Sequence, residues 1–206
     1  MRFIDKIFNH YKALAEIKQI ESLAALDAKI TPTALLQEVA DVLSQAKLKF
    51  TIAGGFARSM HASPRATGDV DIIVAVKDLA TTKTILKRAG FKLKDVLDYQ
   101  KPTRTILKYE FQDRELDILE YEKYPQFVDF LLRTSVTKSL FNTSYSFLGL
   151  EGLIVTKLCS FRYKDKADLV DLIDLKPDLA LIKSWCSELS IMDRFSFLTK
   201  DHSKEK

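Results

Sequence analysis

The chain contains few of the residues that cross-link small extracellular domains or bind zinc. Its 206 residues include two cysteines, Cys159 and Cys186, with no CxxC spacing and no histidine cluster near them. A disulfide framework and a zinc site are therefore both disfavoured. We expect reduced thiols in a cytoplasmic protein.

Long apolar runs and several catalytic motifs are also missing. No stretch approaches the roughly 20 apolar residues of a membrane helix, and the N-terminal segment MRFIDKIFNHYKALAEIKQI alternates charged and apolar residues, unlike a signal peptide. The sequence has no GxxxxGK[ST] loop, no GxSxG motif and no Cys/His pairing. P-loop NTPases and enzymes with an activated serine or cysteine are thus disfavoured, and no membrane partner is expected.

The composition is that of a folded, mildly basic protein. Apolar residues make up 47% of the chain, which is enough for a core in one domain or in two small packed ones. The net charge of +4 and the pI near 8.9 suit a polyanionic ligand such as a nucleotide, without identifying it.

Residue periodicity predicts a mixed α/β half followed by a helical half. In the first half we expect one or two helices over 3–29, a helix from Thr31 and Pro32 to Gln45, strands over 47–52, 69–76 and 91–99, helices over 56–62 and 77–90, and a hairpin around Gln112 and Asp113. In the second half we expect helices over 124–135, 150–175 (two) and 178–198, with a less regular segment over 139–150.

These elements predict an α/β (α+β) fold, in which a mixed sheet is flanked by helices and followed by a helical bundle. We place the α/β domain, with its N-terminal helices, at residues 1–122 and the helical domain at 123–206.

The stretch 51–76 carries the clearest functional signal. Its order of strand, Gly54, Gly55 and helix presents free backbone N–H groups at a helix start, where phosphate oxygens bind. In the next strand Asp69 and Asp71 project to one side, because successive side chains alternate between faces. Two like charges side by side repel unless a cation offsets them, so we predict a divalent metal.

A third carboxylate, Asp117, lies inside a later strand. An adjacent pairing would bring it within roughly 5 Å of Asp69 and Asp71, and three oxygen ligands suit Mg2+. The alternative is that each aspartate is an exposed residue making routine hydrogen bonds, and for Asp117 alone the two readings are evenly balanced.

Lys157 lies on the apolar stripe of a predicted helix, where a charge needs a partner or a route to water. A triphosphate is one candidate partner, and a side chain that reaches solvent past the core edge is the alternative. Asp165 and Asp168 fit cap and first-turn positions of the next helix. We expect Arg162 and Lys164 on a solvated face, and His61 in a structural role.

The chain resembles the nucleotidyltransferase superfamily typified by polymerase beta. The resemblance is carried by GGFA, PRATGDVDIIV, the strand ELDIL and the helical segment over 150–175. Within this superfamily the spacing is similar to that of AbiEii-type toxins. The resemblance implies that Gly54, Gly55, Arg65, Thr67 and Lys157 bind the nucleotide. It implies that Asp69, Asp71 and Asp117 are catalytic and bind metal, and that Asp168 and Asp171 orient Lys157 or the substrate.

The implied activity is transfer of a nucleoside monophosphate from an NTP to a hydroxyl, with Mg2+ or alternatively Mn2+. The resemblance implies a toxin that modifies tRNA or a protein and that has an antitoxin partner. A small-molecule enzyme similar to aminoglycoside nucleotidyltransferases stays open, as does a silent nucleotide-binding module. The minimal antitoxin-like branch is disfavoured, since it begins Gly-Ser where this chain has Gly54, Gly55 and Phe56.

Overall fold

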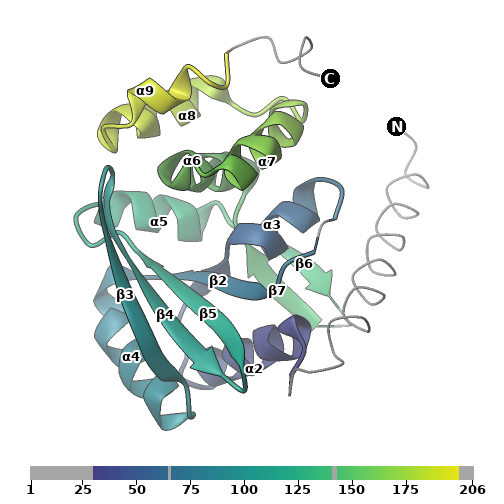
Figure 1. Ribbon diagram of the computed structural model, residues 1–206, viewed down its shortest axis with the longest axis vertical. Helices are drawn as coiled ribbons and strands as arrows, with labels where there is room; N and C mark the ends of the chain where they lie inside the picture. The colour runs from purple at the N-terminus through teal and green to yellow at the C-terminus, as the bar shows by residue number, and fades with distance from the viewer. Residues whose placement is uncertain (1–29, 65, 141–142, 200–206) are drawn as a thin grey trace.

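The computed structural model describes residues 30–64, 66–140 and 143–199 (Figure 1). The helices predicted over 3–29, and Arg65, lie outside the described residues. Within the described part, seven strands form one mixed sheet in the order β3-β4-β5-β2-β1-β7-β6. The strands are β1 (Phe50–Ile52), β2 (Asp69–Val74), β3 (Lys92–Gln100), β4 (Thr103–Phe111), β5 (Arg114–Glu120), β6 (Val136–Leu140) and β7 (Thr143–Phe147).

Helices lie on both sides of this sheet, as the sequence predicted. Figure 1 places α2 (Pro32–Gln45) and α4 (Leu79–Arg88) below the sheet and α3 (Gly54–His61) and α5 (Pro125–Arg133) above it. A further layer at the top of the view contains α6 (Leu150–Ser160), α7 (Tyr163–Ile173), α8 (Leu179–Glu188) and α9 (Met192–Phe195). The strand predicted to reach Val76 is two residues shorter, because β2 stops at Val74 and the 3-10 turn η1 (Val76–Asp78) follows it.

Two local predictions are confirmed by their hydrogen bonds and backbone angles. Thr31 caps α2, since its hydroxyl oxygen accepts the Ala34 N–H at 3.1 Å, and Pro32 occupies the first turn. The turn between β4 and β5 has positive φ at both Gln112 and Asp113, as the type I′ turn of a two-residue hairpin requires.

The prediction of a less regular segment over 139–150 is wrong. Most of it belongs to the hairpin of β6 and β7, and β7 also pairs in parallel with β1 through Ile52 and Phe147. The serines and threonines of this segment blur the apolar alternation by which a strand is recognised, although the two strands pair with each other locally. The domain boundary at residue 122 stays a prediction, although the sheet extends across it.

The prediction of a single helix over 178–198 is also wrong. The segment is divided into α8 and α9, and Ser190 between them has φ of 56°, a left-handed conformation that an α-helix does not accept. No helix of the described ranges is both long and apolar enough to cross a bilayer.

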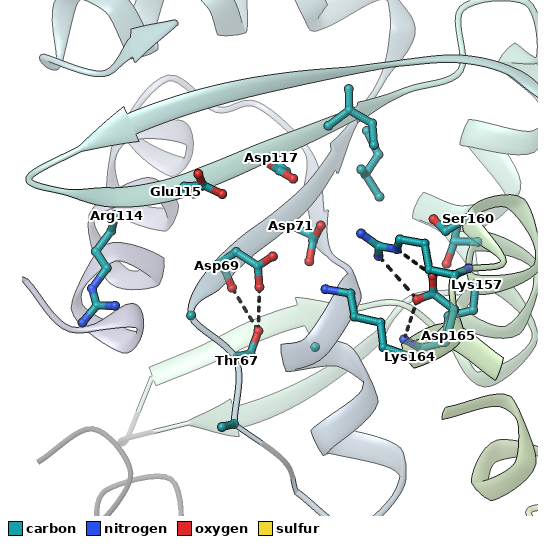
Figure 2. Close-up of a pocket in the computed structure, with 18 of the residues that line it drawn as sticks. Thr67, Asp69, Asp71, Arg114, Glu115, Asp117, Lys157, Ser160, Lys164 and Asp165 are labelled. Carbon is teal, nitrogen blue, oxygen red and sulfur yellow. Dashed lines mark hydrogen bonds and ion pairs between the residues drawn. The ribbon is translucent and has the colours of Figure 1, made fainter. Parts of the chain in front are cut away.

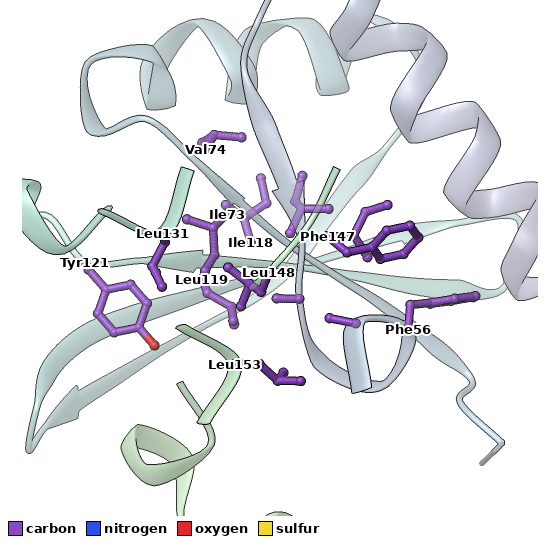
Figure 3. Close-up of a cluster of buried hydrophobic side chains, with 14 of the residues drawn as sticks. Phe56, Ile73, Val74, Ile118, Leu119, Tyr121, Leu131, Phe147, Leu148 and Leu153 are labelled. Atoms are coloured by element: carbon purple, nitrogen blue, oxygen red, sulfur yellow. The ribbon is translucent and has the colours of Figure 1, made fainter. Parts of the chain in front are cut away.

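One face of the sheet changes from acidic to apolar along β2 and β5. Asp69 and Asp71 share that face with Ile73, and Asp117 shares it with Leu119, because alternate residues point the same way. The aspartates are clustered at one end (Figure 2), whereas Ile73 and Leu119 are buried with residues of α5 and α6 (Figure 3). The overlying helices therefore bury the apolar part and leave the acidic part open.

Candidate functional site

A pocket of about 450 Å3 opens where the helices stop covering the sheet. It lies between the start of β2 and β5 on one side and α3, α6 and the start of α7 on the other (Figure 2). Its lining includes most of the residues singled out from the sequence, namely Gly54, Gly55, Thr67, Asp69, Asp71, Asp117, Lys157, Arg162, Lys164 and Asp165.

The three aspartates converge as predicted. β2 and β5 are parallel neighbours, and Asp71 lies directly opposite Asp117 in their register. One carboxylate oxygen from each of Asp69, Asp71 and Asp117 lies within 4.8 Å of the others. The convergence is confirmed, and the reading of Asp117 as an isolated exposed residue is wrong, because Asp117 is only 8% exposed.

A fourth carboxylate, Glu115, was missed. It lies opposite Asp69 in the same register and lines the pocket beside Asp117 (Figure 2). Its position two residues before Asp117 in a strand could have revealed it, since residues i and i+2 share a face.

The two glycines at the start of α3 are required by close packing against the aspartate strand. Gly54 has φ of +56°, and a Cβ atom there would lie 1.7 Å from Asp71 Oδ2. A Cβ at Gly55 would lie 2.5 Å from Thr67 Oγ1. The Thr67 hydroxyl donates to Asp69 Oδ1 at 2.8 Å, so Thr67 holds one of the clustered carboxylates in place.

Lys157 is buried, and its partners are carboxylates of α7. Its Nζ lies 2.5 Å from Asp168 Oδ2 and 3.7 Å from Asp165 Oδ1, and the side chain is 5% exposed. The alternative in which Lys157 reaches water past the core edge is therefore wrong. Asp168 thus contacts Lys157, as its predicted role of orienting this lysine requires.

Arg58, on α3, completes this buried network and was not found from the sequence. Its Nε lies 3.3 Å from Asp168 Oδ1, and its Nη2 donates to Asp171. Asp171 thus pairs with Arg58, which ties the glycine-initiated helix to α7. The burial of Arg58 against a distant helix leaves no signal in the local sequence.

Asp165 caps α7 from the first turn of the helix, where the N-cap residue is Arg162, so the prediction of Asp165 at the cap and Asp168 in the first turn was placed too late in the chain. Its Oδ2 accepts the backbone N–H of Arg162 at 3.1 Å and the Arg162 Nε–H at 2.8 Å. Arg162 and Lys164 are exposed at the rim of the pocket, as expected for a solvated face.

Lys108, on β4, was also missed. It lies opposite Asp117 in the antiparallel register and donates to both Asp117 carboxylate oxygens, at 3.1 and 3.2 Å. Burial lowers the pKa of Lys108, but its hydrogen bonds and ion pairs with Asp117 and Glu115 outweigh that effect and raise it overall.

The electrostatics of the cluster favour a bound cation. Burial, followed by repulsion from Asp69 and Asp117, raises the pKa of Asp71 to about 7. Burial likewise raises the pKa of Asp117, although Lys108 opposes the shift. Hard carboxylate oxygens in this arrangement are the donors that divalent ions such as Mg2+ and Mn2+ take, so these residues fit a metal ion.

We predict that metal binding depends on pH because a proton and the metal compete for Asp71. Below the raised pKa of about 7, the apparent affinity for Mn2+ should fall by up to about tenfold per pH unit, and above pH 8 it should be constant. Calorimetric titration between pH 5.5 and 8.5 would measure this. Equal affinities at pH 6 and pH 8 would contradict the prediction.

The same shift affects the stability of the metal-free protein. An unfolded aspartate loses its proton near pH 3.8, whereas folded Asp71 keeps it to about pH 7, so the folded state binds more protons between these values. The Asp71 contribution to the free energy of unfolding must therefore decrease as pH rises from about 4 to 7.

The residues expected to be structural have protein partners. His61 Nε2 lies 2.7 Å from the Leu148 carbonyl oxygen, which supports a structural role. Cys159 and Cys186 are free and buried, and burial raises the pKa of both thiols to about 12.

Comparison with solved structures identifies the fold. A candidate nucleotidyltransferase from Thermotoga maritima is 17% identical, with a TM-score of 0.51 over 72% of this chain and 97% of its own. A nucleotidyltransferase-like antigen of Paracoccidioides brasiliensis is 20% identical, with a TM-score of 0.48 over 84% of this chain and 94% of its own. The antibiotic-resistance factor ANT(2″)-Ia, solved with adenylyl-2″-tobramycin, is 14% identical, with a TM-score of 0.48 over 80% and 95%.

No protein-family model and no curated protein sequence matches the chain. The likeness to the Thermotoga protein shows that the chain has a nucleotidyltransferase fold, which confirms the fold class expected from the sequence resemblance.

Proposed function

We propose that this chain, which has a nucleotidyltransferase fold, transfers a nucleoside monophosphate from an NTP to a hydroxyl acceptor. The observation that carries the proposal is the convergence of Asp69, Asp71 and Asp117 beside the glycine-initiated helix α3. A fold alone hosts many activities, so the site and not the fold decides the reaction.

Asp69 and Asp71 would hold Mg2+, with Mn2+ as an alternative ion. When bound, the metal would stabilise negative charge on the phosphate oxygens. Thr67 orients Asp69 through its 2.8 Å hydrogen bond, and Gly54 lets the backbone of α3 approach Asp71. Both contacts prepare the carboxylates before substrate arrives.

The start of α3 would bind the triphosphate. Residues at a helix start have N–H groups without a partner in the helix, and Gly54 and Gly55 at the start of α3 line the pocket. Arg162 and Lys164, which are exposed, would add positive charge, as would the buried Lys157, which also lines the pocket. Arg65, predicted to steady the nucleotide, remains a proposal from the sequence.

Asp117 would accept the proton of the acceptor hydroxyl. The acceptor oxygen forms a bond to the α-phosphorus, the bond from that phosphorus to the bridging oxygen breaks, and pyrophosphate leaves. The raised pKa of Asp117 suits a proton acceptor, because a more basic carboxylate takes a proton more readily.

We propose tRNA or a protein as the acceptor. The chain would then be a toxin-type enzyme of the cytoplasm that an antitoxin silences. The rival acceptor is a small molecule such as an aminoglycoside. A pocket of about 450 Å3 is within the size range of small-molecule sites, so the rival also fits the space.

The test is to incubate the purified protein with each α-labelled NTP and Mg2+, together with total RNA, cell protein or aminoglycosides. We expect one acceptor class to be labelled, and EDTA to abolish the labelling. Labelled RNA or protein would support the toxin reading, and labelled antibiotic the rival. Metal-dependent NTP binding without pyrophosphate release for any acceptor would instead favour a silent binding module.

A further inference from the structure

Lys108 occupies an unusual position beside the acidic cluster. Its ammonium lies 3.1 Å from Asp117 Oδ1, 3.2 Å from Asp117 Oδ2 and 3.1 Å from Glu115 Oε2. It is not among the residues that line the pocket, so it reaches Asp117 from the β4 side. Lys108 therefore contacts the carboxylate without contacting the space where substrate would bind.

The sheet register places three charges in a row across adjacent strands. Lys108 on β4 is opposite Asp117 on β5, and Asp117 is opposite Asp71 on β2. Asp117 is thus held between a cation of the chain on one side and the aspartate pair of β2 on the other. A metal ion that used Asp117 would have to share it with the Lys108 ammonium.

A second lysine on the same hairpin shows that this arrangement is not a routine surface pair. Lys94 lies 3.1 Å from Glu110, and the two side chains are 54% and 34% exposed. The Lys108 and Asp117 side chains are 24% and 11% exposed. Because screening by water is weaker for the less exposed pair, Lys108 should affect the charge of its partner far more.

We propose that Lys108 is a positioning residue that acts as the internal counter-cation of Asp117 and opposes the binding of a second divalent ion there. The first ion then binds at Asp69 and Asp71, and Asp117 stays on the β4 side, ready to accept the acceptor proton. The proton-accepting part rests on the proposed function, whereas the effect on metal binding does not.

The test counts bound Mn2+ without nucleotide at pH 8, by electron paramagnetic resonance of the free ion. Wild type should bind one ion tightly. In Lys108→Met the dissociation constant of the second ion should fall by about tenfold or more, since a positive charge beside its ligand is removed. Lys108→Arg keeps the charge and should behave as wild type, and so should the control Lys94→Met.

Thermal unfolding is a second measurement, and it distinguishes a counter-cation from a lysine with a purely structural role. In EDTA, Lys108→Met should unfold at a lower temperature than wild type, because Asp117 loses its partner. Saturating Mn2+ should remove that difference, and a variant that fails to fold in EDTA should be recovered by refolding with Mn2+. Binding curves for Lys108→Met and wild type that coincide would overturn the proposal, as would a stability loss that Mn2+ does not reverse.

These outcomes are separate from those of the transfer assay. A protein that labels no acceptor but shows the Lys108→Met shift would lose the proposed function and keep the counter-cation. A protein that transfers nucleotide without the shift would keep the function and lose the role of Lys108.

Discussion

Asp71→Asn is expected to lower nucleotide transfer by at least about 10^3-fold, since several kcal/mol of charge stabilisation by the metal would be lost. Asp71 shares a strand face with Asp69 and lies opposite Asp117 in the register, so in this variant an ion held by Asp69 and Asp71 as proposed would lose a charged ligand. Asparagine has nearly the same shape but offers a neutral ligand oxygen. The measurement is the rate of label transfer from an α-labelled NTP.

The same variant should fold at least as well as wild type without metal. Burial and repulsion raise the pKa of Asp71 to about 7, so the ionised carboxylate is unfavourable at pH 8, and the neutral amide removes that repulsion. Mg2+ should raise the unfolding temperature of wild type and leave that of Asp71→Asn unchanged. Asp41→Asn, at an exposed position of α2, is the control and should keep full activity. Undiminished transfer by Asp71→Asn would refute the site assignment.

Gly54→Ala is expected to cost about 2 kcal/mol or more of unfolding free energy and to lower activity by at least about 100-fold. The backbone at Gly54 has φ of +56°, which strains any residue with a Cβ, and that Cβ would lie 1.7 Å from Asp71 Oδ2. Either the start of α3 or the Asp71 carboxylate must move. Either movement would disturb the contact between the proposed metal ligand Asp71 and the proposed phosphate-binding start of α3.

Urea denaturation and the transfer assay would measure the two effects. Gly68→Ala is the matched control for stability, because a Cβ at Gly68 meets no atom within 4 Å, so its unfolding free energy should stay within about 0.5 kcal/mol of wild type. Equal stability of Gly54→Ala and Gly68→Ala would show that α3 and β2 are not in the close contact described.

The parts of the fold that the sequence predicted well are those decided by local chemistry. Thr31 with Pro32 marked the start of α2, and Gln112 with Asp113 marked the hairpin, because caps and tight turns depend on a few neighbouring residues. The hairpin of β6 and β7 was missed because its serines and threonines blur the apolar alternation, and the pairing of Phe147 with Ile52 on β1 is a contact that no local pattern predicts. The break at Ser190 was missed because an amphipathic pattern can continue through a turn.

The candidate site divides in the same way. Asp69 and Asp71 were readable because two carboxylates at i and i+2 of a strand necessarily share a face. The roles of Lys108 and Arg58 could not be predicted, because each depends on a partner on another element. Lys108 pairs with Asp117 across two strands, and Arg58 pairs with Asp168 and Asp171 on a distant helix.

By itself the sequence determined which ionisable groups are present, which of them share a face of one strand, and where a local cap or tight turn starts or ends an element, because these follow from the order of neighbouring residues. Only the tertiary structure decided that Asp117 lies opposite Asp71, that Lys157 pairs with Asp168, and that Lys108 pairs with Asp117. Those contacts join residues far apart in the chain. They arise from the packing of whole strands and helices, in which strand order and register set the distance between charges.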